Sequence, residues 1–218
     1  MVLPGDPRGR NGPLTVAVAG LVAKAPARPA QCGLTMAVDV LFIHSAGPQS
    51  GEQGSAPLLR HLRRGLGARF RVHAPTMPLP DSPSYDRWQA ELETRLPPDR
   101  SPRFLVGHSL GASVLLKYLS EQDRSAWPAG LFLVATPWWG DQGWDAREFT
   151  LRNGFEKALP ETLRIHLYQA RNDEVVAFDH VSRYAEALPR ATVHALDGGG
   201  HTFPDGLPDL VRDIGALP

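Results

Sequence analysis

One stretch of this chain of 218 residues indicates its fold: Arg103-Phe104-Leu105-Val106-Gly107-His108-Ser109-Leu110-Gly111. It opens with a short apolar run typical of a buried strand, and residues 112–119 that follow it have the pattern of a helix. Between them lies G-x-S-x-G, which in a strand–turn–helix context predicts a sharp turn that carries an exposed serine. Small residues are needed two before and two after the serine, because a Cβ atom there would clash with neighbouring backbone. Ser109 is therefore a candidate nucleophile at a helix N-terminus that favours negative charge.

On both sides of this stretch, apolar runs alternate with amphipathic segments. We predict strands at 38–44, 70–73, 103–106, 130–136, 163–168 and 191–196. We predict helices at 57–66, 85–96, 112–119, 178–188 and 207–217. This alternation predicts an α/β fold of three αβα layers around a mostly parallel six-stranded sheet. No internal repeat or domain-sized linker interrupts the pattern, so we expect one domain over residues 36–218, with a short tryptophan-rich insertion at 137–160.

The first 35 residues have a different composition, rich in Pro, Gly, Ala and Arg. One apolar stretch, residues 14–23, has arginines before it and an Ala/Pro-rich segment after it, which is the outline of a secretory signal peptide. That stretch is short, and Met36 stands directly before the first predicted strand. We expect residues 1–35 to be a disordered tail or a segment upstream of a natural start at Met36, with a signal peptide as the alternative.

Charge and composition exclude several classes of function. Lys plus Arg and Asp plus Glu both number 23, a balance that leaves no electrostatic footprint for nucleic acid or an anionic membrane. No run of residues is long enough to span a bilayer. Cys32 is the single cysteine, so no internal disulfide can form, and no Cys/His cluster predicts a metal. We expect no nucleic-acid, membrane or metal partner and a cytoplasmic location, since the cysteine count fits a reducing compartment.

A serine nucleophile needs a base beside it and an acid that holds the base. In a doubly wound sheet such groups belong on loops that leave the carboxyl ends of strands. Asp173 follows the strand predicted to end at 168, and His201 follows three glycines after the strand predicted to end at 196. The chain order Ser109, Asp173, His201 therefore predicts a catalytic triad.

Each partner of Ser109 has competitors along the chain. Glu174, Asp179 and Asp197 are alternative acids, and Asp173 itself could simply cap the following helix. His166, His180 and His194 are alternative bases, although His166 and His194 fall inside predicted strands. The conjunction of three groups, each at the carboxyl end of a strand, favours the triad over these separate readings.

Two further parts of an active site are predicted from the same loops. An oxyanion hole needs two backbone N–H groups, for which we expect Leu110, the residue after the serine, and Ala46, in the loop after the first strand. Trp138, Trp139 and Trp144 follow the strand predicted at 130–136 and therefore lie on the same side of the sheet. We predict that they wall an acyl or aromatic pocket, the alternative being a small cap that packs onto the domain.

Three motifs together resemble the α/β-hydrolase superfamily: Gly107 to Gly111, Arg171 to Val176, and Gly199-Gly200-His201. The resemblance extends from Val38 to the C-terminus. The short length, the absence of a large lid and the helix that starts after Ser109 look most like the small serine hydrolases related to retinoblastoma-binding protein 9. The resemblance implies a reduced α/β-hydrolase fold, a Ser-Asp-His triad and no cofactor. The chain departs from relatives at His44-Ser45, where they often have His-Gly, which makes the second oxyanion amide less secure than the triad.

The residues and the resemblance lead to one expected function. We expect a serine hydrolase that cleaves small ester-type acyl substrates through an acyl-enzyme. A weakly catalytic or non-catalytic protein-binding module on the same fold is one alternative, and an acyltransferase or thioesterase is another. The sequence leaves the oligomeric state open.

Overall fold

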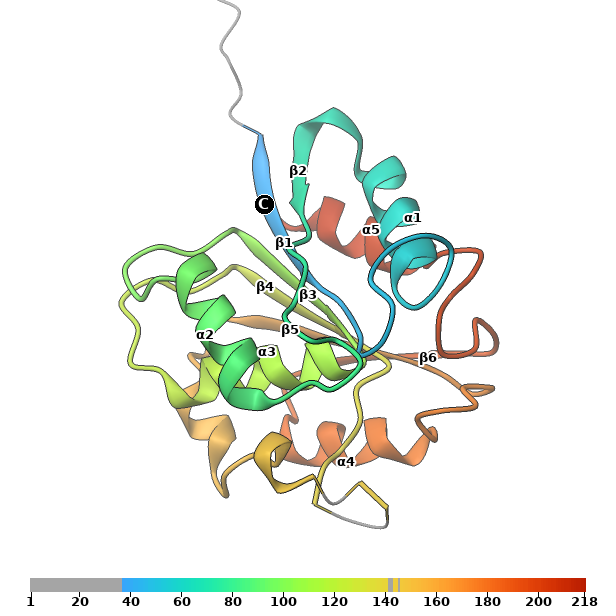
Figure 1. Ribbon diagram of the computed structural model, residues 1–218. Coiled ribbons are helices and arrows are strands. Elements are labelled where there is room, and N and C mark those ends of the chain that lie inside the picture. Colours follow the sequence, from blue (N-terminus) through green and yellow to red (C-terminus); the bar gives the residue numbers. More distant parts are fainter. Residues whose placement is uncertain (1–36, 141–142, 145) are drawn as a thin grey trace, which may run out of the picture. The chain divides into compact units, whose positions relative to one another are not determined.

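A computed structural model of the protein describes residues 37–140, 143–144 and 146–218, and its core is one six-stranded sheet (Figure 1). All neighbouring strands are parallel, in the order β2-β1-β3-β4-β5-β6. The strands are β1 (Val38–Ile43), β2 (Phe70–His73), β3 (Phe104–His108), β4 (Gly130–Val134), β5 (Arg164–Ala170) and β6 (Thr192–Leu196). The predicted α/β class and all six strands are confirmed. The tail predicted at 1–35 lies outside the described residues.

Five helices cover the two faces of the sheet (Figure 1). They are α1 (Ala56–Leu66), α2 (Tyr85–Arg95), α3 (Leu110–Glu121), α4 (Asp179–Ala187) and α5 (Pro208–Ala216). One apolar core contains buried residues of α2, α3 and α4, and the other contains those of α1 and α5. The three-layer arrangement is therefore the one that the alternating sequence pattern predicts.

Strand β3 shows why the sequence needs a continuous apolar run here. All five of its residues are buried, because helices cover both faces. Leu105 enters the core with α2, α3 and α4, whereas Phe104 and Val106 enter the core with α1 and α5. On α1, Leu58, Leu62 and Leu66 recur every four residues and are buried as the amphipathic pattern predicts.

The sheet order reverses between β1 and β3, which determines where a site can form. The chain passes from β1 to β2 on one side and then crosses to β3 on the other side of β1. The loops that follow β1 and β3 therefore leave a crevice between them at the carboxyl ends of these strands, the usual ligand position in open α/β sheets.

The insertion predicted at 137–160 contains short 3-10 helices at Arg147–Phe149 and Phe155–Ala158, and a third lies outside it at Gly67–Arg69. Its residues Phe149, Phe155 and Leu159 are buried in the core on the α3 side. Among the helices that the structure describes, none is long and apolar enough to cross a membrane.

Candidate active site

Ser109 sits at a sharp turn between β3 and α3, with backbone angles of φ 53° and ψ −120°. A residue other than glycine rarely adopts a positive φ, so the backbone at Ser109 is strained and must be held by its surroundings. The serine amide donates a hydrogen bond to the carbonyl oxygen of Val134 on β4 (2.8 Å). The turn thus holds the hydroxyl at the carboxyl end of the sheet.

The glycines on either side of the serine are required by close backbone contacts. A Cβ atom on Gly107 would lie 2.4 Å from the Cα of Ala112, and one on Gly111 would lie 2.3 Å from the carbonyl oxygen of His44. Neither neighbour is a flexible side-chain end that could move away. The spacing of glycines in the motif is therefore explained by this turn.

His201 lies beside Ser109, although 92 residues separate them along the chain. Its Nε2 is 3.1 Å from the Ser109 Oγ, and both residues are largely buried. The histidine stands on the loop after β6, where Gly199 and Gly200 have φ of 123° and 54°. Glycine tolerates these angles, so the glycine run allows the tight path that brings the imidazole to the serine.

Asp173 completes the set from the loop after β5. Its two carboxylate oxygens lie 3.1 and 3.0 Å from Nδ1 of His201, and its side chain is fully buried. The amides of Val175 and Val176 donate to Oδ1 at 2.9 and 2.8 Å, and the Gln169 side chain donates to Oδ2 at 2.9 Å. Burial acts to raise the pKa of Asp173, but the hydrogen bonds from His201 and these amides outweigh it, so the pKa is lowered. The carboxylate is ionised at neutral pH and accepts a hydrogen bond from Nδ1–H of His201, which leaves Nε2 unprotonated and able to accept the serine proton.

The turn that carries Asp173 also holds the backbone of the histidine loop. Asn172 accepts a hydrogen bond from the amide of Gly200 (3.0 Å), and Glu174 accepts one from the amide of His201 (3.3 Å). From the sequence, Glu174 is only an alternative to Asp173 as the acid. The structure instead places it on the main chain of His201, so three consecutive side chains of one turn position the imidazole.

Leu110 and Ala46, the predicted oxyanion residues, both line a cavity with Ser109. Leu110 is the first residue of α3, where backbone N–H groups have no partner within the helix. In the loop after β1, the amide of Ser45 donates a hydrogen bond to Ser55 Oγ, and the amide of Gly47 donates one to the carbonyl oxygen of Pro80, both at 2.8 Å. The Ala46 amide makes no such bond to the residues that the structure describes, so among the amides of residues 45–47 it is the one available to a ligand.

The cavity at Ser109 has a volume of about 330 Å³ and mainly apolar walls. Trp139, Trp144 and Phe149 line it, with the Trp139 ring 5.0 Å from each of the other two rings. The lining residues, so far as the structure describes them, are Ser45, Ala46, Gly54, Pro83, Ser109, Leu110, Pro137, Trp139, Trp144, Phe149, Val175, His201 and Thr202. Two of the three predicted tryptophans thus face the cavity, and Phe149 from the insertion joins them.

Trp138 does not line this cavity, contrary to the prediction for the three tryptophans. Its ring packs edge-on against Tyr184 of α4, with 4.9 Å between ring centroids, and its amide donates to Nδ1 of His180 (2.7 Å). The neighbouring side chains of Trp138 and Trp139 thus have different surroundings, one at α4 and the other at the cavity. Trp138 therefore packs on the domain, as the alternative interpretation of this segment had it.

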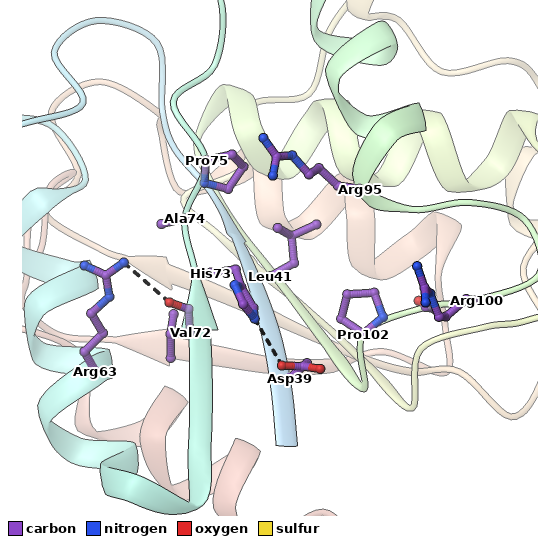
Figure 2. Close-up of a pocket in the computed structure, with 11 residues that line it drawn as sticks. Asp39, Leu41, Arg63, Val72, His73, Ala74, Pro75, Arg95, Arg100 and Pro102 are labelled. Carbon is purple, nitrogen blue, oxygen red and sulfur yellow. Dashed lines mark hydrogen bonds and ion pairs between the residues drawn. The ribbon is translucent and has the colours of Figure 1, made fainter. Parts of the chain in front are cut away.

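A second cavity, of about 580 Å³, borders the sheet edge at β2 (Figure 2). Arg63, Arg95 and Arg100 reach it from α1, from the end of α2 and from the loop before β3. Inside it, His73 lies 3.1 Å from Asp39, a pair drawn in Figure 2. None of Ser109, Asp173 and His201 lines this cavity, so the smaller cavity is the one that holds a nucleophile beside a base.

One side-chain cluster in the described part of the chain offers three potential metal ligands: His166, His194 and Asp213. Nδ1 of His166 lies 3.1 Å from Nε2 of His194, and Asp213 accepts a hydrogen bond from the Tyr168 hydroxyl at 2.7 Å. Nε2 of His194 also lies 3.3 Å from Asp213, so these side chains form one polar network on β5, β6 and α5. The cluster lies on β5, β6 and α5 and shares no residue with the cavity at Ser109.

Two buried histidines next to the site make the stability of the fold sensitive to acid. Burial lowers the pKa of His44 to about 4 and that of His108 to about 3. Both are neutral in the folded protein but take up a proton near pH 6.5 in the unfolded chain, so stability is lost as pH falls below about 6.5. We expect the free energy of unfolding to fall by up to about 1.4 kcal/mol per pH unit for each such group between pH 6.5 and 4.5.

Urea denaturation at pH 7.5, 6.5, 5.5 and 4.5 measures this effect. The His44→Leu variant removes one of the two groups and should show a shallower loss. Asp173 does not contribute to this change, because its pKa is lowered in the folded protein and its effect on stability sets in only at pH values below the ordinary carboxyl pKa. A free energy of unfolding that stays constant down to pH 4.5 would contradict the burial of neutral histidines.

Solved structures of hydrolases share this fold. The ydeN gene product from B. subtilis has a TM-score of 0.69 and 22% sequence identity, covering 82% of this chain and 97% of that one. A YdeN-like hydrolase from Pectobacterium atrosepticum has a TM-score of 0.60 and 18% identity, covering 83% and 90%. The esterase domain of a Rhodothermus marinus protein has a TM-score of 0.55 and 16% identity, covering 86% and 85%.

No curated protein sequence matches the chain. The sequence model of one family, described as serine hydrolase, matches residues 51–205. Because that match covers most of the chain, from the loop before α1 to the loop after β6, the protein belongs to the serine hydrolase family, and its fold is α/β-hydrolase-like.

Proposed function

We propose that this protein hydrolyses small, uncharged ester-type acyl substrates through a covalent intermediate on Ser109. The observation that carries the proposal is one chain of contacts. Ser109 Oγ lies 3.1 Å from Nε2 of His201, and Nδ1 of the same ring lies 3.0 Å from the buried carboxylate of Asp173. A nucleophile, a base and an orienting acid within hydrogen-bond reach of one another are the parts that acyl transfer by serine requires.

The first half of the reaction forms the acyl-enzyme. His201 takes the Ser109 proton as Oγ attacks the carbonyl carbon of the ester, and the carbonyl oxygen becomes an oxyanion. The amides of Leu110 and Ala46 donate hydrogen bonds to that oxyanion. Asp173 stabilises the imidazolium, which then gives its proton to the leaving alcohol as the carbon–oxygen bond breaks.

The second half of the reaction returns the enzyme to its starting state. Water enters the position of the leaving alcohol, and His201 takes one of its protons as its oxygen attacks the acyl carbon. The tetrahedral oxyanion is held by the same two amides, and the proton returns to Ser109 as the acid product leaves. Every step uses groups of this chain and water.

The walls of the cavity support a small and uncharged acyl group. Its volume, about 330 Å³, is at the lower end of the range for ligand pockets. Trp139, Trp144 and Phe149 offer apolar ring surface, and no Asp, Glu, Lys or Arg is among the described lining residues. A charged acyl group would lose its hydration there without gaining a partner.

A panel of p-nitrophenyl esters from acetate to decanoate, with matched thioesters and aminoacyl amides, tests the proposal. We expect hydrolysis of short and medium esters, with kcat/KM falling for acyl groups that carry a carboxylate. Thioester cleavage at rates above those of the esters would instead favour a thioesterase. Absence of turnover on the whole panel, with the protein folded, would favour a binding module.

Trp139 should control acyl-chain preference, because its ring forms part of the cavity wall and its Nε1 is held by Ser113 Oγ at 2.9 Å. Trp139→Ala enlarges the cavity, so the ratio of kcat/KM for octanoate to that for butyrate should rise about 10-fold. Trp138→Ala is the matched control, since the Trp138 ring packs on Tyr184 and does not line the cavity. Equal ratios in wild type and Trp139→Ala, or an equal change in the Trp138→Ala control, would count against an aromatic acyl wall.

A further inference from the structure

A buried chain of hydrogen bonds runs behind the serine turn and joins two loops of the site. Nε2 of His108 lies 2.8 Å from the carbonyl oxygen of His201, and its Nδ1 lies 2.8 Å from Ser55 Oγ. Ser55 Oγ in turn lies 2.8 Å from the amide nitrogen of Ser45 and 3.0 Å from its hydroxyl. His108 and Ser55 are completely buried, so water does not compete for these contacts.

The partners fix the direction of every bond in this chain. The carbonyl of His201 can only accept, so Nε2 of His108 carries the proton. Burial lowers the pKa of His108 to about 3, so the ring is neutral and its Nδ1 has no proton. Ser55 must therefore donate its hydroxyl proton to Nδ1, and its oxygen accepts from both the amide and the hydroxyl of Ser45. Each donor meets an acceptor, and no group in the chain is left unsatisfied.

The two ends of the chain meet the site at its base and at its oxyanion loop. At one end, the carbonyl of His201 is held by His108 while its amide is held by Glu174, so the backbone of this residue is fixed on both sides. At the other end, Ser45 directly precedes Ala46, which lines the same cavity as Ser109. His108 itself is the last residue of β3 and directly precedes Ser109. The backbone of His201, the loop that carries Ser45 and the serine turn are therefore all connected to the same strand end.

We infer that His108 is a positioning residue, which through Ser55 sets the place of the His201 backbone and of the Ala46 amide relative to Ser109. The inference rests on the proposed function. His108 touches neither the nucleophile oxygen nor the cavity, so it acts through the residues that it holds. Catalysis depends steeply on such placement, and an error of about 1 Å can cost about 100-fold in rate.

The tautomer of His108 is the first test, because it needs no variant in the measured protein. Long-range ¹H–¹⁵N correlation spectra of protein labelled at histidine distinguish Nε2–H from Nδ1–H rings, and the His108→Asn spectrum assigns the signal. We expect the Nε2–H tautomer, with a ring proton protected from solvent exchange. An Nδ1–H tautomer would reverse the chain and overturn the inference.

Substitutions that keep one half of the chain provide the second test. His108→Gln keeps an amide donor that can reach the His201 carbonyl, whereas His108→Asn keeps an acceptor for Ser55 but is too short to reach that carbonyl. We expect kcat on the best ester to fall about 10- to 100-fold in His108→Asn, with KM changed less than about 2-fold, and to stay within about 5-fold of wild type in His108→Gln. His166→Asn, which removes a ring from β5 on the same face of the sheet, is the control with unchanged kcat.

Ser55→Ala tests the other arm and removes only one buried oxygen, so the variant remains measurable if His108→Asn does not fold. We expect kcat to fall about 10-fold with KM nearly unchanged, against no change in the Ser101→Ala control. Wild-type kcat in Ser55→Ala and in folded His108→Asn, or equal losses in His108→Asn and His108→Gln, would overturn the inference. If wild-type protein neither hydrolyses esters nor reacts with a fluorophosphonate, the proposed function fails; if it does both and the variants match it, the inference alone fails.

Discussion

Replacing Ser109 with alanine is expected to lower kcat for ester hydrolysis by at least about 10⁴-fold. The substitution removes the oxygen that forms the covalent bond and leaves the rest of the site in place, since alanine differs from serine only by that atom. Oxyanion amides and substrate binding remain, so a small residual rate above the uncatalysed reaction is expected. Initial rates on the preferred p-nitrophenyl ester, extended with a product assay over hours, measure a loss of this size.

Two controls separate this loss from a folding defect. Circular dichroism and the thermal midpoint should match those of wild type, because the turn at φ 53° carries no more strain with alanine than with serine. Ser101→Ala, on the loop before β3, removes another serine hydroxyl and should retain full activity. Retention of more than about a tenth of the activity in folded Ser109→Ala would show that another group carries the reaction.

Replacing Asp173 with asparagine is expected to lower kcat by about 10⁴-fold with little change in KM. The buried carboxylate accepts from Gln169, from the amides of Val175 and Val176, and from His201 Nδ1. An asparagine has only one acceptor oxygen, whereas all these neighbours are hydrogen-bond donors. Its NH₂ group must therefore face a group that previously donated to the carboxylate. If the NH₂ faces His201, Nδ1 loses its proton and Nε2 gains it, which leaves no base for Ser109.

The measurement combines steady-state kinetics with the tautomer of His201 in the same histidine-labelled spectra. Asp179→Asn is the matched control, because this carboxylate was a competing candidate by sequence, is mostly exposed and lies 3.9 Å from Arg183. We expect the control to keep wild-type kcat. An Asp173→Asn variant within about 10-fold of wild type would show that Asp173 does not orient the base.

Much of the fold follows from the sequence because each strand is buried on both faces. Continuous apolar runs such as 104–106 are typical of strands covered on both faces, and helices that alternate with them indicate parallel strands. The ends of the elements follow less well. The strand predicted to reach 136 stops at Val134, because Ala135 adopts a positive φ of 50° that ends the extended backbone. The helix after the serine begins at Leu110, two residues earlier than predicted, since the sharp turn at Ser109 is itself its N-cap.

The triad residues could be placed because their order and loop positions carry the information. Asp173 and His201 both follow strands, and parallel strands bring such loops to one edge. The direction of neighbouring side chains does not follow in the same way, so the sequence predicts Trp138 and Trp139 in one wall, whereas only Trp139 lines the cavity. Phe149 lines the cavity from an insertion whose path no periodic pattern encodes.

The contacts of His108 were also beyond sequence reasoning. The position before the serine is unspecified in G-x-S-x-G, so the motif gives no reason to examine it. Its partners, Ser55 and the carbonyl of His201, are 53 and 93 residues away, and an ordinary serine and a backbone atom carry no sequence signal. Their convergence depends on the parallel sheet, which brings the loops after β1, β3 and β6 to the same edge although β6 is not a neighbour of β1 or β3.

The central claim is that Ser109 is a nucleophile activated within the folded protein. The most direct measurement is to react wild-type protein with a fluorophosphonate, determine the intact mass, and locate the modified residue by peptide mass spectrometry. We predict one adduct per chain, on Ser109, that forms with native protein and not with protein unfolded in urea. No adduct on the native protein, or an adduct on another residue with Ser109 unmodified, would contradict it.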